Sequence, residues 1–238
     1  MQQDDRESYL GFWKEFGLVL KEGPAESFED KDKIAELFMF HTSNNLQKLS
    51  TLDEYIERMP KEQEKIFYAV GESIEAVSQS PHIEKLQESG TEVLLLTDRI
   101  DEWLMTSLFN YKEKEFADVA KEPISDEEIK VSKEDSELIE RLNKSLKDKV
   151  EKVLTSSRLT KSAVCLVRSK HEPGIQMRRI LEAAGQKVPE SKPMLEINLK
   201  HKLIKKISKL DSKDFNQYAK FLFDYARSEE HTSEPVTL

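Results

Sequence analysis

The sequence has few of the residues on which several classes of protein depend. Among its 238 residues Cys165 is the single cysteine, so the chain can build neither an internal disulfide nor a thiolate metal cage. Its seven glycines fall well below the usual share of about 7%, which argues against collagen-like chains, flexible linkers and glycine-rich phosphate loops. No run of about 18 apolar residues is present, so no membrane-spanning helix is expected. The first residues lack a secretion-signal layout, and a cytoplasmic, reducing setting is expected.

Charge is abundant, and its sign is negative. Charged residues make up 35% of the chain, the formal net charge is −9 and the pI is near 5.3. Nucleic-acid binding depends on clustered Lys and Arg, so this balance argues against a nucleic-acid partner. A hydrophobic fraction of 37% is enough for a folded core, and the length predicts one or two domains.

The beginning of the chain predicts helices. The apolar spacing across residues 12–20 predicts a helix that Gly23-Pro24 ends, and a second helix is expected from Ile34 to about residues 41–45. A third, short helix is expected over Leu52–Met59, with Asp53 as its N-cap.

A strand–helix–strand unit follows and is the clearest pattern of the sequence. Residues 65–70 and 92–97 are typical of short buried strands, and between them Ser80-Pro81 starts a helix that ends near Gly90. This order predicts a parallel strand pair joined by a right-handed connection. The other elements expected in this half are a helix over 100–109 and an edge strand over 116–119.

The second half predicts a separate α+β domain, entered through an acidic connection. A long amphipathic helix is expected from Glu134, and strands over 153–159 and 163–167 are expected to pair with each other. The other elements expected are a helix over 173–184 ended by Gly185, a half-buried strand over 194–199, and helices over 202–210 and 213–226. The predicted fold class is therefore α/β followed by α+β: a small α-β-α subdomain with a short parallel sheet, then a mixed α+β domain.

No catalytic or metal-binding motif accompanies these elements. The sequence has no G-x-G-x-x-G, G-x-x-x-x-G-K-[ST], H-E-x-x-H or G-x-S-x-G pattern. Its five histidines are scattered singly, away from any second His or Cys at ligand spacing, so no metal is expected. Cys165 lies in an apolar run, which is typical of a small buried residue rather than a nucleophile.

Two stretches have features that a binding site could use. After the second buried strand, Trp103 can either fold into the core or stand half exposed beside Glu102. Asp98 or Asp101 is expected to cap the helix that starts there. The amphipathic stretch 173–181 can present an adaptable methionine-containing surface, with core packing as the default.

Several groups of residues resemble the motifs of one family. Residues 12–23, Phe-Trp-Lys-Glu-Phe-Gly-Leu-Val-Leu-Lys-Glu-Gly, are similar to an FW-x-x-FG-x-x-LKEG segment. Ser80-Pro81-His82, Gly90 and Val93 to Trp103 resemble an SPH…G-x-EVLLL-[ST]-D-R-[IV]-DEW signature, and residues 183–190 and 196–198 resemble a bacterial branch. The family is that of the heat-shock protein 90 chaperones, and the match runs in order over about residues 7–226.

The resemblance implies a piece of a dimeric, ATP-driven chaperone. Residues 1–121 would be the C-terminal part of the middle domain, 122–133 a linker, and 134–226 a truncated C-terminal dimerisation domain. The family's ATP- and Mg-binding domain and its catalytic arginine would lie outside this chain, so neither a cofactor nor ATPase activity is expected here. The expected partners are unfolded or partly folded client proteins and, weakened in this chain, a second copy; neither nucleic acid nor membrane is expected.

The resemblance also assigns contact residues. The positions that match the family's client-binding residues are Glu102, Trp103, Thr106, Met177, Ile180 and Leu181. Thr106 stands where the bacterial branch usually has Asn, and Pro173 replaces a further Met. Dimerisation in the family uses a four-helix bundle with two helices from each protomer. The residues that resemble the first of these helices are Phe215, Tyr218, Leu222 and Ala226.

The last residues depart from the family. After Ala226 the sequence shows no helical period and no closing bundle helix, and residues 227–238 resemble a translated sequencing adapter. They are expected to be a non-native tail, and dimerisation is expected to be weak or absent, with an exposed aromatic face. The alternative function is that of a small α/β enzyme with a site near Asp98–Trp103; the resemblance favours the chaperone fragment.

Overall fold

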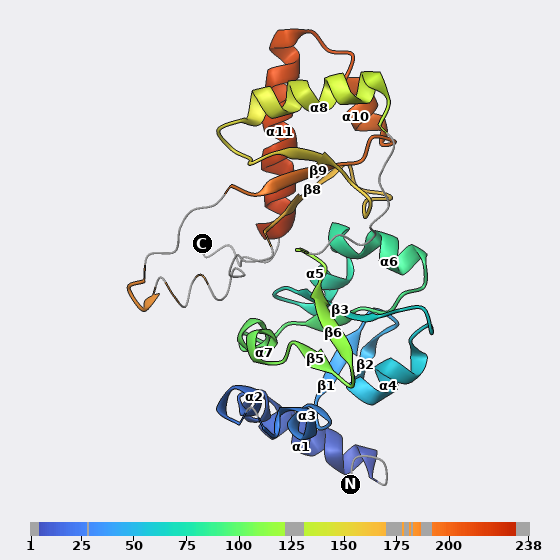
Figure 1. Cartoon of the computed structure of the whole chain (residues 1–238), viewed down its shortest axis with the longest axis vertical. Helices are drawn as coiled ribbons and strands as arrows, with labels where there is room; N and C mark the ends of the chain where they lie inside the picture. Colours follow the sequence, from blue (N-terminus) through green and yellow to red (C-terminus); the bar gives the residue numbers. More distant parts are fainter. Residues whose placement is uncertain are drawn as a thin grey trace. The chain divides into compact units, whose positions relative to one another are not determined.

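The computed structural model describes residues 5–27, 29–121, 131–169, 178, 181, 183–186 and 192–231 (Figure 1). Among them two compact units are found, each with its own hydrophobic core. The first unit combines Met1–Ser78, Gly90–Asp118 and Pro173–Gln186; the second combines Gln79–Ser89, Val119–Glu172 and Lys187–Leu238. The boundaries expected at 121, 133 and 226 stay predictions, and most of the expected linker lies outside the described residues.

The first unit is built on a six-stranded mixed sheet with the order β2-β1-β4-β3-β6-β5. Strand β3 pairs in parallel with β4 on one side and with β6 on the other, and the other pairings are antiparallel. The predicted parallel pair is therefore confirmed, but the sheet is larger and mixed. The strand expected at its edge corresponds to β6, and the edge itself is formed by β5. The strands are β1 (Met39–Thr42), β2 (Asn45–Thr51), β3 (Lys65–Val70), β4 (Leu94–Leu96), β5 (Asn110–Tyr111) and β6 (Lys114–Asp118).

The labelled helices of the first unit's described part pack around this sheet or lie before and between its strands. They are α1 (Arg6–Leu20), α2 (Gly23–Glu26), α3 (Lys31–Ala35), α4 (Leu52–Arg58), α5 (Ile74–Ser78) and α7 (Asp101–Ser107). The helix expected from Ile34 into residues 41–45 is wrong, because α3 ends at Ala35 and the β1–β2 hairpin follows. Phe38, Met39 and Phe40 are all buried. Besides β2, strand β1 pairs with β4, which lies about 50 residues later in the chain, and local spacing does not reveal this pairing.

Helix α4 begins where the sequence predicts, but with a different cap. Its N-cap is Thr51, whose hydroxyl accepts from the Glu54 N–H while the Glu54 carboxylate accepts from the Thr51 N–H. This reciprocal capping box satisfies two amide groups that the first turn leaves free. The expected cap, Asp53, instead accepts hydrogen bonds from Tyr111 and Lys112.

The second unit holds a three-stranded sheet with the order β7-β9-β8. Its strands are β7 (Val153–Thr155), β8 (Val164–Val167) and β9 (Met194–Ile197). The predicted pairing of the first two is wrong: β9 lies between them, parallel to β7 and antiparallel to β8. Leu195 and Ile197 belong to the core, and Glu196 between them is also buried, where its carboxylate accepts from Ser156 and Arg158. The expected alternation between core and solvent is therefore not seen.

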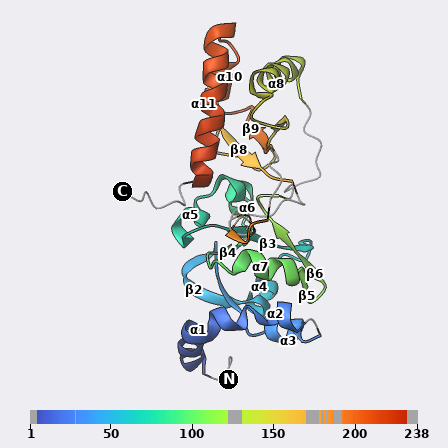
Figure 2. The ribbon, with the colours of Figure 1, turned by 90° about the vertical axis from the view of Figure 1, so that its left-hand side faces the viewer.

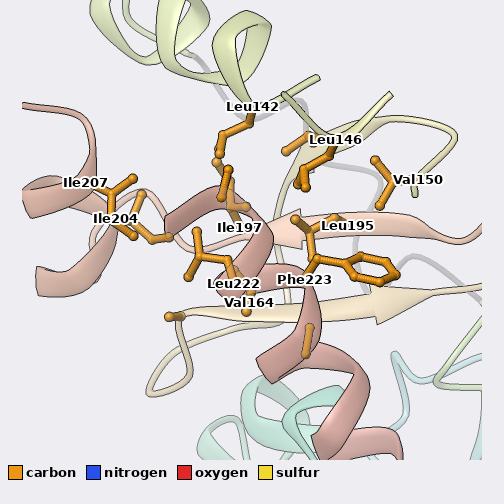
Figure 3. Packing of buried hydrophobic residues seen from close by; sticks show 14 of the residues in the cluster. Leu142, Leu146, Val150, Val164, Leu195, Ile197, Ile204, Ile207, Leu222 and Phe223 are labelled. Atoms are coloured by element: carbon orange, nitrogen blue, oxygen red, sulfur yellow. The ribbon is translucent and has the colours of Figure 1, made fainter. Parts of the chain in front are cut away.

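The described part of the second unit also contains helices, and those after residue 132 supply side chains to its core. They are the 3-10 helix η1 (Pro81–Ile83), α6 (Glu84–Glu88), α8 (Lys133–Leu146), α10 (Lys202–Ile207) and α11 (Ser212–His231). Figure 2 shows the long α11 running beside β8, and Figure 3 shows Leu142 and Leu146 of α8 facing Leu195 of β9 across the core. Ser80 caps η1 as predicted, through a hydrogen bond to the His82 N–H.

Helix α11 continues beyond the residue at which the sequence suggests that it ends. Residues 227–229 belong to the helix but are all exposed. This stretch therefore has no buried face, which agrees with its lack of an apolar period. Residues 232–238 of the expected non-native tail lie outside the described residues. None of the helices described in the structure is long and apolar enough to cross a membrane.

Candidate functional site

The loop between β4 and α7 starts at the centre of the first unit's sheet. Strand β4 is buried and lies between β1 and β3, and β3 runs parallel to it. The carboxyl end of such a strand is a favoured place for functional groups. Helix α7 begins after residues 97–100, and its Leu104, together with Leu108 just beyond the helix, enters the unit's core. The sheet therefore fixes where α7 starts.

A buried ammonium group joins this loop to the end of α1. Lys21 is the C-cap residue of α1, and its side chain is only 3% exposed. Its Nζ lies 2.6 Å from Asp98 Oδ2 and 2.6 Å from Asp101 Oδ1. The same Nζ lies 4.9 Å from the centre of the Phe40 ring and 5.9 Å from the centre of the Trp13 ring. Two carboxylates and two aromatic rings thus lie around one cation, and all of these contacts are favourable for it.

Asp101 joins the start of α7 to the loop before it through its second oxygen. Its Oδ2 accepts a hydrogen bond of 2.9 Å from the Asp98 N–H. The expected cap is corrected here, because the N-cap residue is Ile100 and no side chain caps the helix. Burial raises the pKa of Asp101 above its ordinary value, although Lys21 acts in the opposite direction. The carboxyl group is therefore placed for structure, between a cation and an amide.

The residues predicted to bind clients on α7 lie at or near the surface. Glu102 and Trp103 are half-buried and Thr106 is exposed. The two alternatives for Trp103 are thus resolved toward a partly exposed ring, while Leu104 next to it is the core residue. The Thr106 hydroxyl donates to the Trp103 carbonyl oxygen at 2.7 Å, which closes the turn between them.

An exposed aromatic residue that the sequence reasoning missed follows α7 directly. Phe109 is 51% exposed, and the Lys31 Nζ lies 4.2 Å from the centre of its ring. Lys31 also donates to Asn110 Oδ1 at 2.6 Å. The lysine therefore holds the segment after α7 against α3 while the Phe109 ring stays accessible. The sequence gives little sign of this, because the expected helix over 100–109 includes Phe109, whereas α7 ends at Ser107.

The second predicted client-binding group is described only in part. Met177 and Ile180 lie outside the described residues, and Leu181 is half-buried in a helical stretch. The Leu181 carbonyl oxygen accepts from the Gln186 N–H at 2.9 Å, and Gly185 has a positive φ of 76°. The predicted helix end at Gly185 is therefore confirmed.

The structure divides the four residues predicted for dimerisation. Phe215, Leu222 and Ala226 are buried in the second unit's own core, and their part in dimerisation stays a prediction. Tyr218 is 44% exposed, and the other large apolar side chains of α11 that are exposed in the described part are Phe221 at 53% and Tyr225 at 38%. The Phe221 and Tyr225 rings stack with their centres 6.2 Å apart. The free aromatic face of α11 is thus Tyr218, Phe221 and Tyr225.

The remaining groups considered for chemistry can be located within the described part of the chain. Within it no group of three or more His, Cys, Asp or Glu side chains is placed to hold a metal ion. Cys165 is buried in β8. Asp98 and Asp101, the carboxylates nearest to the alternative enzyme site, are both engaged by Lys21.

Comparisons with known proteins agree with the motifs. The family model described as Hsp90 protein matches residues 1–230. Chaperone protein HtpG of Shewanella amazonensis is 42% identical over 247 aligned residues, which cover 98% of this chain and 39% of that protein. Chaperone protein HtpG of Idiomarina loihiensis is 42% identical over 239, which cover 95% and 37%. The chain thus spans about two fifths of the length of these curated relatives. With the family model matched over nearly the whole sequence, the chain belongs to the Hsp90 protein family.

Proposed function

We propose that this chain is a client-binding and self-associating part of an Hsp90-type chaperone. Its clients are unfolded or partly folded proteins, and it acts on them by binding. Family membership and the names of the two relatives, both chaperone proteins, support the class of function. The observation that carries the proposal is the partly exposed Trp103 on a short helix whose start is held by a buried ion pair.

The geometry of α7 suits an apolar segment of an unfolded protein. Trp103 and Phe109 offer aromatic surface, and such residues dominate the binding energy of interfaces. Glu102 and Thr106 place polar groups beside them, so backbone amides of a bound segment would have partners. Met177, Ile180 and Leu181 would supply a second apolar surface. Binding of this kind needs no reaction step by the chain.

The energy-dependent part of chaperone action would lie outside this chain. The resemblance assigns ATP and Mg to a domain that precedes these residues in the full-length protein, together with the ATPase activity. Homodimerisation would use α11, through its free aromatic face of Tyr218, Phe221 and Tyr225. The cytoplasmic setting expected from the sequence also stays a proposal.

The test measures binding of an unfolded client to the full 238-residue chain. The client is a reduced, alkylated globular protein that carries a fluorescent label and cannot refold. We expect the variant Trp103→Ala to weaken binding roughly tenfold, as for a central aromatic contact. Phe16→Ala is the matched control, because it removes another exposed aromatic ring of the same unit from α1. Binding that is equal in the parent and Trp103→Ala would refute the assignment.

The alternative enzyme has its own test. If the site near Asp98 performs chemistry, Asp98→Asn should abolish turnover of some substrate while the chain stays folded. Screening the parent chain against hydrolase and transferase substrates provides the reference rate. Activity that survives in Asp98→Asn, or that is absent from the parent, favours the binding function.

A further inference from the structure

Lys21 lies in the first unit, far in sequence from the helix that carries Trp103, yet its Nζ contacts the start of that helix. We propose that Lys21 is a positioning residue that fixes the orientation of α7 and thereby of Trp103. The inference rests on the proposed function, because it assigns to Lys21 a part in client binding. Lys21 itself is buried and does not touch a client.

The contacts of Lys21 restrain α7 at its first residue. Asp101 is that residue, and both of its oxygens are used: one by Lys21 Nζ at 2.6 Å and one by the Asp98 N–H at 2.9 Å. Asp98 also takes the second contact of Lys21, so the loop before the helix and the helix itself share one anchor. Trp103 follows two residues later on the same turn. A rotation of this turn would therefore move the Trp103 ring directly.

The anchor is specific for a cation. Asp98 and Asp101 lie within hydrogen-bond distance of the same ammonium group, so without it their like charges would oppose each other. Asp101 is almost wholly buried, and a buried carboxylate that loses its partner must either take up a proton or move toward water. Both responses change the first turn of α7. Leu104 and Leu108 stay in the core, so we expect the helix to reorient rather than to unfold.

A purely stabilising role makes a different prediction, and the same unit contains a suitable comparison. Arg58 of α4 forms a two-point ion pair with the buried Glu92, at 2.9 Å and 2.8 Å, and also donates to Ser50 Oγ. Its loss removes a charge partner from a buried carboxylate without touching α7. The variant Arg58→Met is therefore the matched control for Lys21→Met.

The experiment combines client binding with fluorine NMR of the full chain labelled with 5-fluorotryptophan. The chain has two tryptophans, and Trp103→Phe assigns their resonances. Only the Trp103 signal is diagnostic, because Trp13 lies next to the Lys21 Nζ and responds to its loss in any case. Binding is measured with the labelled, permanently unfolded client described above. Urea unfolding gives the stability of each variant.

We expect Lys21→Met to shift the Trp103 resonance and to weaken client binding roughly tenfold, as strong coupling within an ion-pair network allows. Arg58→Met should lose comparable stability and leave the Trp103 resonance and the client affinity within about twofold of the parent. The inference is overturned if Lys21→Met changes neither quantity, or if Arg58→Met weakens binding as much as Lys21→Met does.

A milder variant covers the case in which Lys21→Met fails to fold. Asp98→Asn removes one of the two ion pairs at a side chain that is partly exposed, and we expect a smaller shift of the Trp103 resonance and roughly threefold weaker binding. An unchanged resonance in Asp98→Asn contradicts the inference. Failure of the proposed function is recognised separately: Trp103→Ala would then bind the client as the parent does, while the resonance still reports on positioning.

Discussion

Glu84 and Ser162 join two segments of the second unit that are distant in sequence: the Ser162 hydroxyl donates to Glu84 Oε1 at 2.6 Å. The backbone N–H groups of Thr160, Lys161 and Ser162 donate to the same carboxylate at 2.8 to 3.1 Å. Burial alone would raise the pKa of Glu84, but these hydrogen bonds outweigh it and hold the pKa below its ordinary value. The carboxylate therefore fastens α6 to the turn before β8.

Replacing this carboxylate by an amide should weaken the second unit. In Glu84→Gln one oxygen becomes an NH₂ group that faces backbone donors, so we expect a loss of about 1–3 kcal/mol. The control is Glu88→Gln, an exposed position at the end of the same helix. Both tryptophans lie in the first unit, so amide hydrogen exchange in β8 and β9 is the suitable measurement. Equal protection in the two variants would contradict the role of Glu84.

Gly17 should resist a substitution that usually stabilises a helix. A Cβ added at Gly17 would lie 2.9 Å from two ring atoms of Trp13, which is buried in the first core. Alanine gains up to about 1 kcal/mol over glycine inside a helix, but a forced contact in a packed core costs about 1–3 kcal/mol. We therefore expect Gly17→Ala to lower the free energy of unfolding by about 1 kcal/mol, as measured by urea unfolding followed by tryptophan fluorescence.

The control for this prediction is on the same helix. A Cβ at Gly11 meets nothing within 4 Å, so Gly11→Ala should stabilise the first unit. Stabilisation by both substitutions would show that the Trp13 ring moves aside at little cost and that its packing does not require glycine at position 17.

The parts of the fold that the sequence predicts are those set by short local signals. Strands β3 and β4 are compact apolar runs between clear helix signals, and their parallel pairing follows from the connection. The order of the strands in the second sheet is not predictable in this way, because β9 lies between β7 and β8 although it comes later in the chain. Local patterns do not encode which strand supplies the missing hydrogen bonds. The β1–β2 hairpin is local, and the sequence points to a helix there because Ile34, Leu37 and Phe38 also have helical spacing.

The candidate site shows a similar division. The residue pattern alone leaves Trp103 open between core and surface, and the family resemblance marks it as a contact residue. Lys21 has no feature in the sequence that indicates burial. On α11 two apolar stripes have helical spacing, and the sequence alone does not say which one faces the sheet. The structure assigns Phe215 and Leu222 to the core and leaves Phe221 on the surface. Which stripe is buried depends on packing against β8 and α8.

His82 makes the stability of the second unit depend on pH. Burial, with Arg158 and Arg168 nearby, lowers the pKa of His82 to about 3. In the unfolded chain the imidazole of His82 takes up a proton near pH 6.5, whereas in the folded chain the same imidazole is still neutral at this pH. Between these values the unfolded state holds more protons, so stability falls as the pH drops below about 6.5, by up to about 1.4 kcal/mol for each pH unit.

This dependence is tested with His82→Asn at about pH 7 and about pH 5.5, both above the range in which carboxylates such as Glu84 titrate. Hydrogen exchange in β8 and β9 gives the free energy of opening at each pH, after correction for the intrinsic exchange rate. The parent should lose about 1 kcal/mol over this interval, and the variant should lose much less. The same loss in both proteins would assign the effect to other groups.

Self-association through α11 should be weak and should depend on its exposed aromatic face. Stable interfaces bury about 1,200–2,000 Å² in total. One aromatic side chain buries about 150–250 Å² at most, and Tyr218, Phe221 and Tyr225 are already partly covered. We therefore expect the chain to be monomeric at about 1 μM and to associate only at higher concentration, as followed by sedimentation velocity.

Replacing Tyr218, Phe221 and Tyr225 by serine should abolish this association without unfolding the second unit, because all three side chains lie outside its core. The control replaces Gln217 and Lys220, exposed polar residues of the same helix, by serine and should associate as the parent does. A chain that remains a tight dimer after the aromatic substitutions would place the contact elsewhere. A parent that is already a tight dimer at about 1 μM would show that the interface is larger than this face. Two such faces contribute six side chains that are already about half covered, and these bury less than the total area that such a dimer requires.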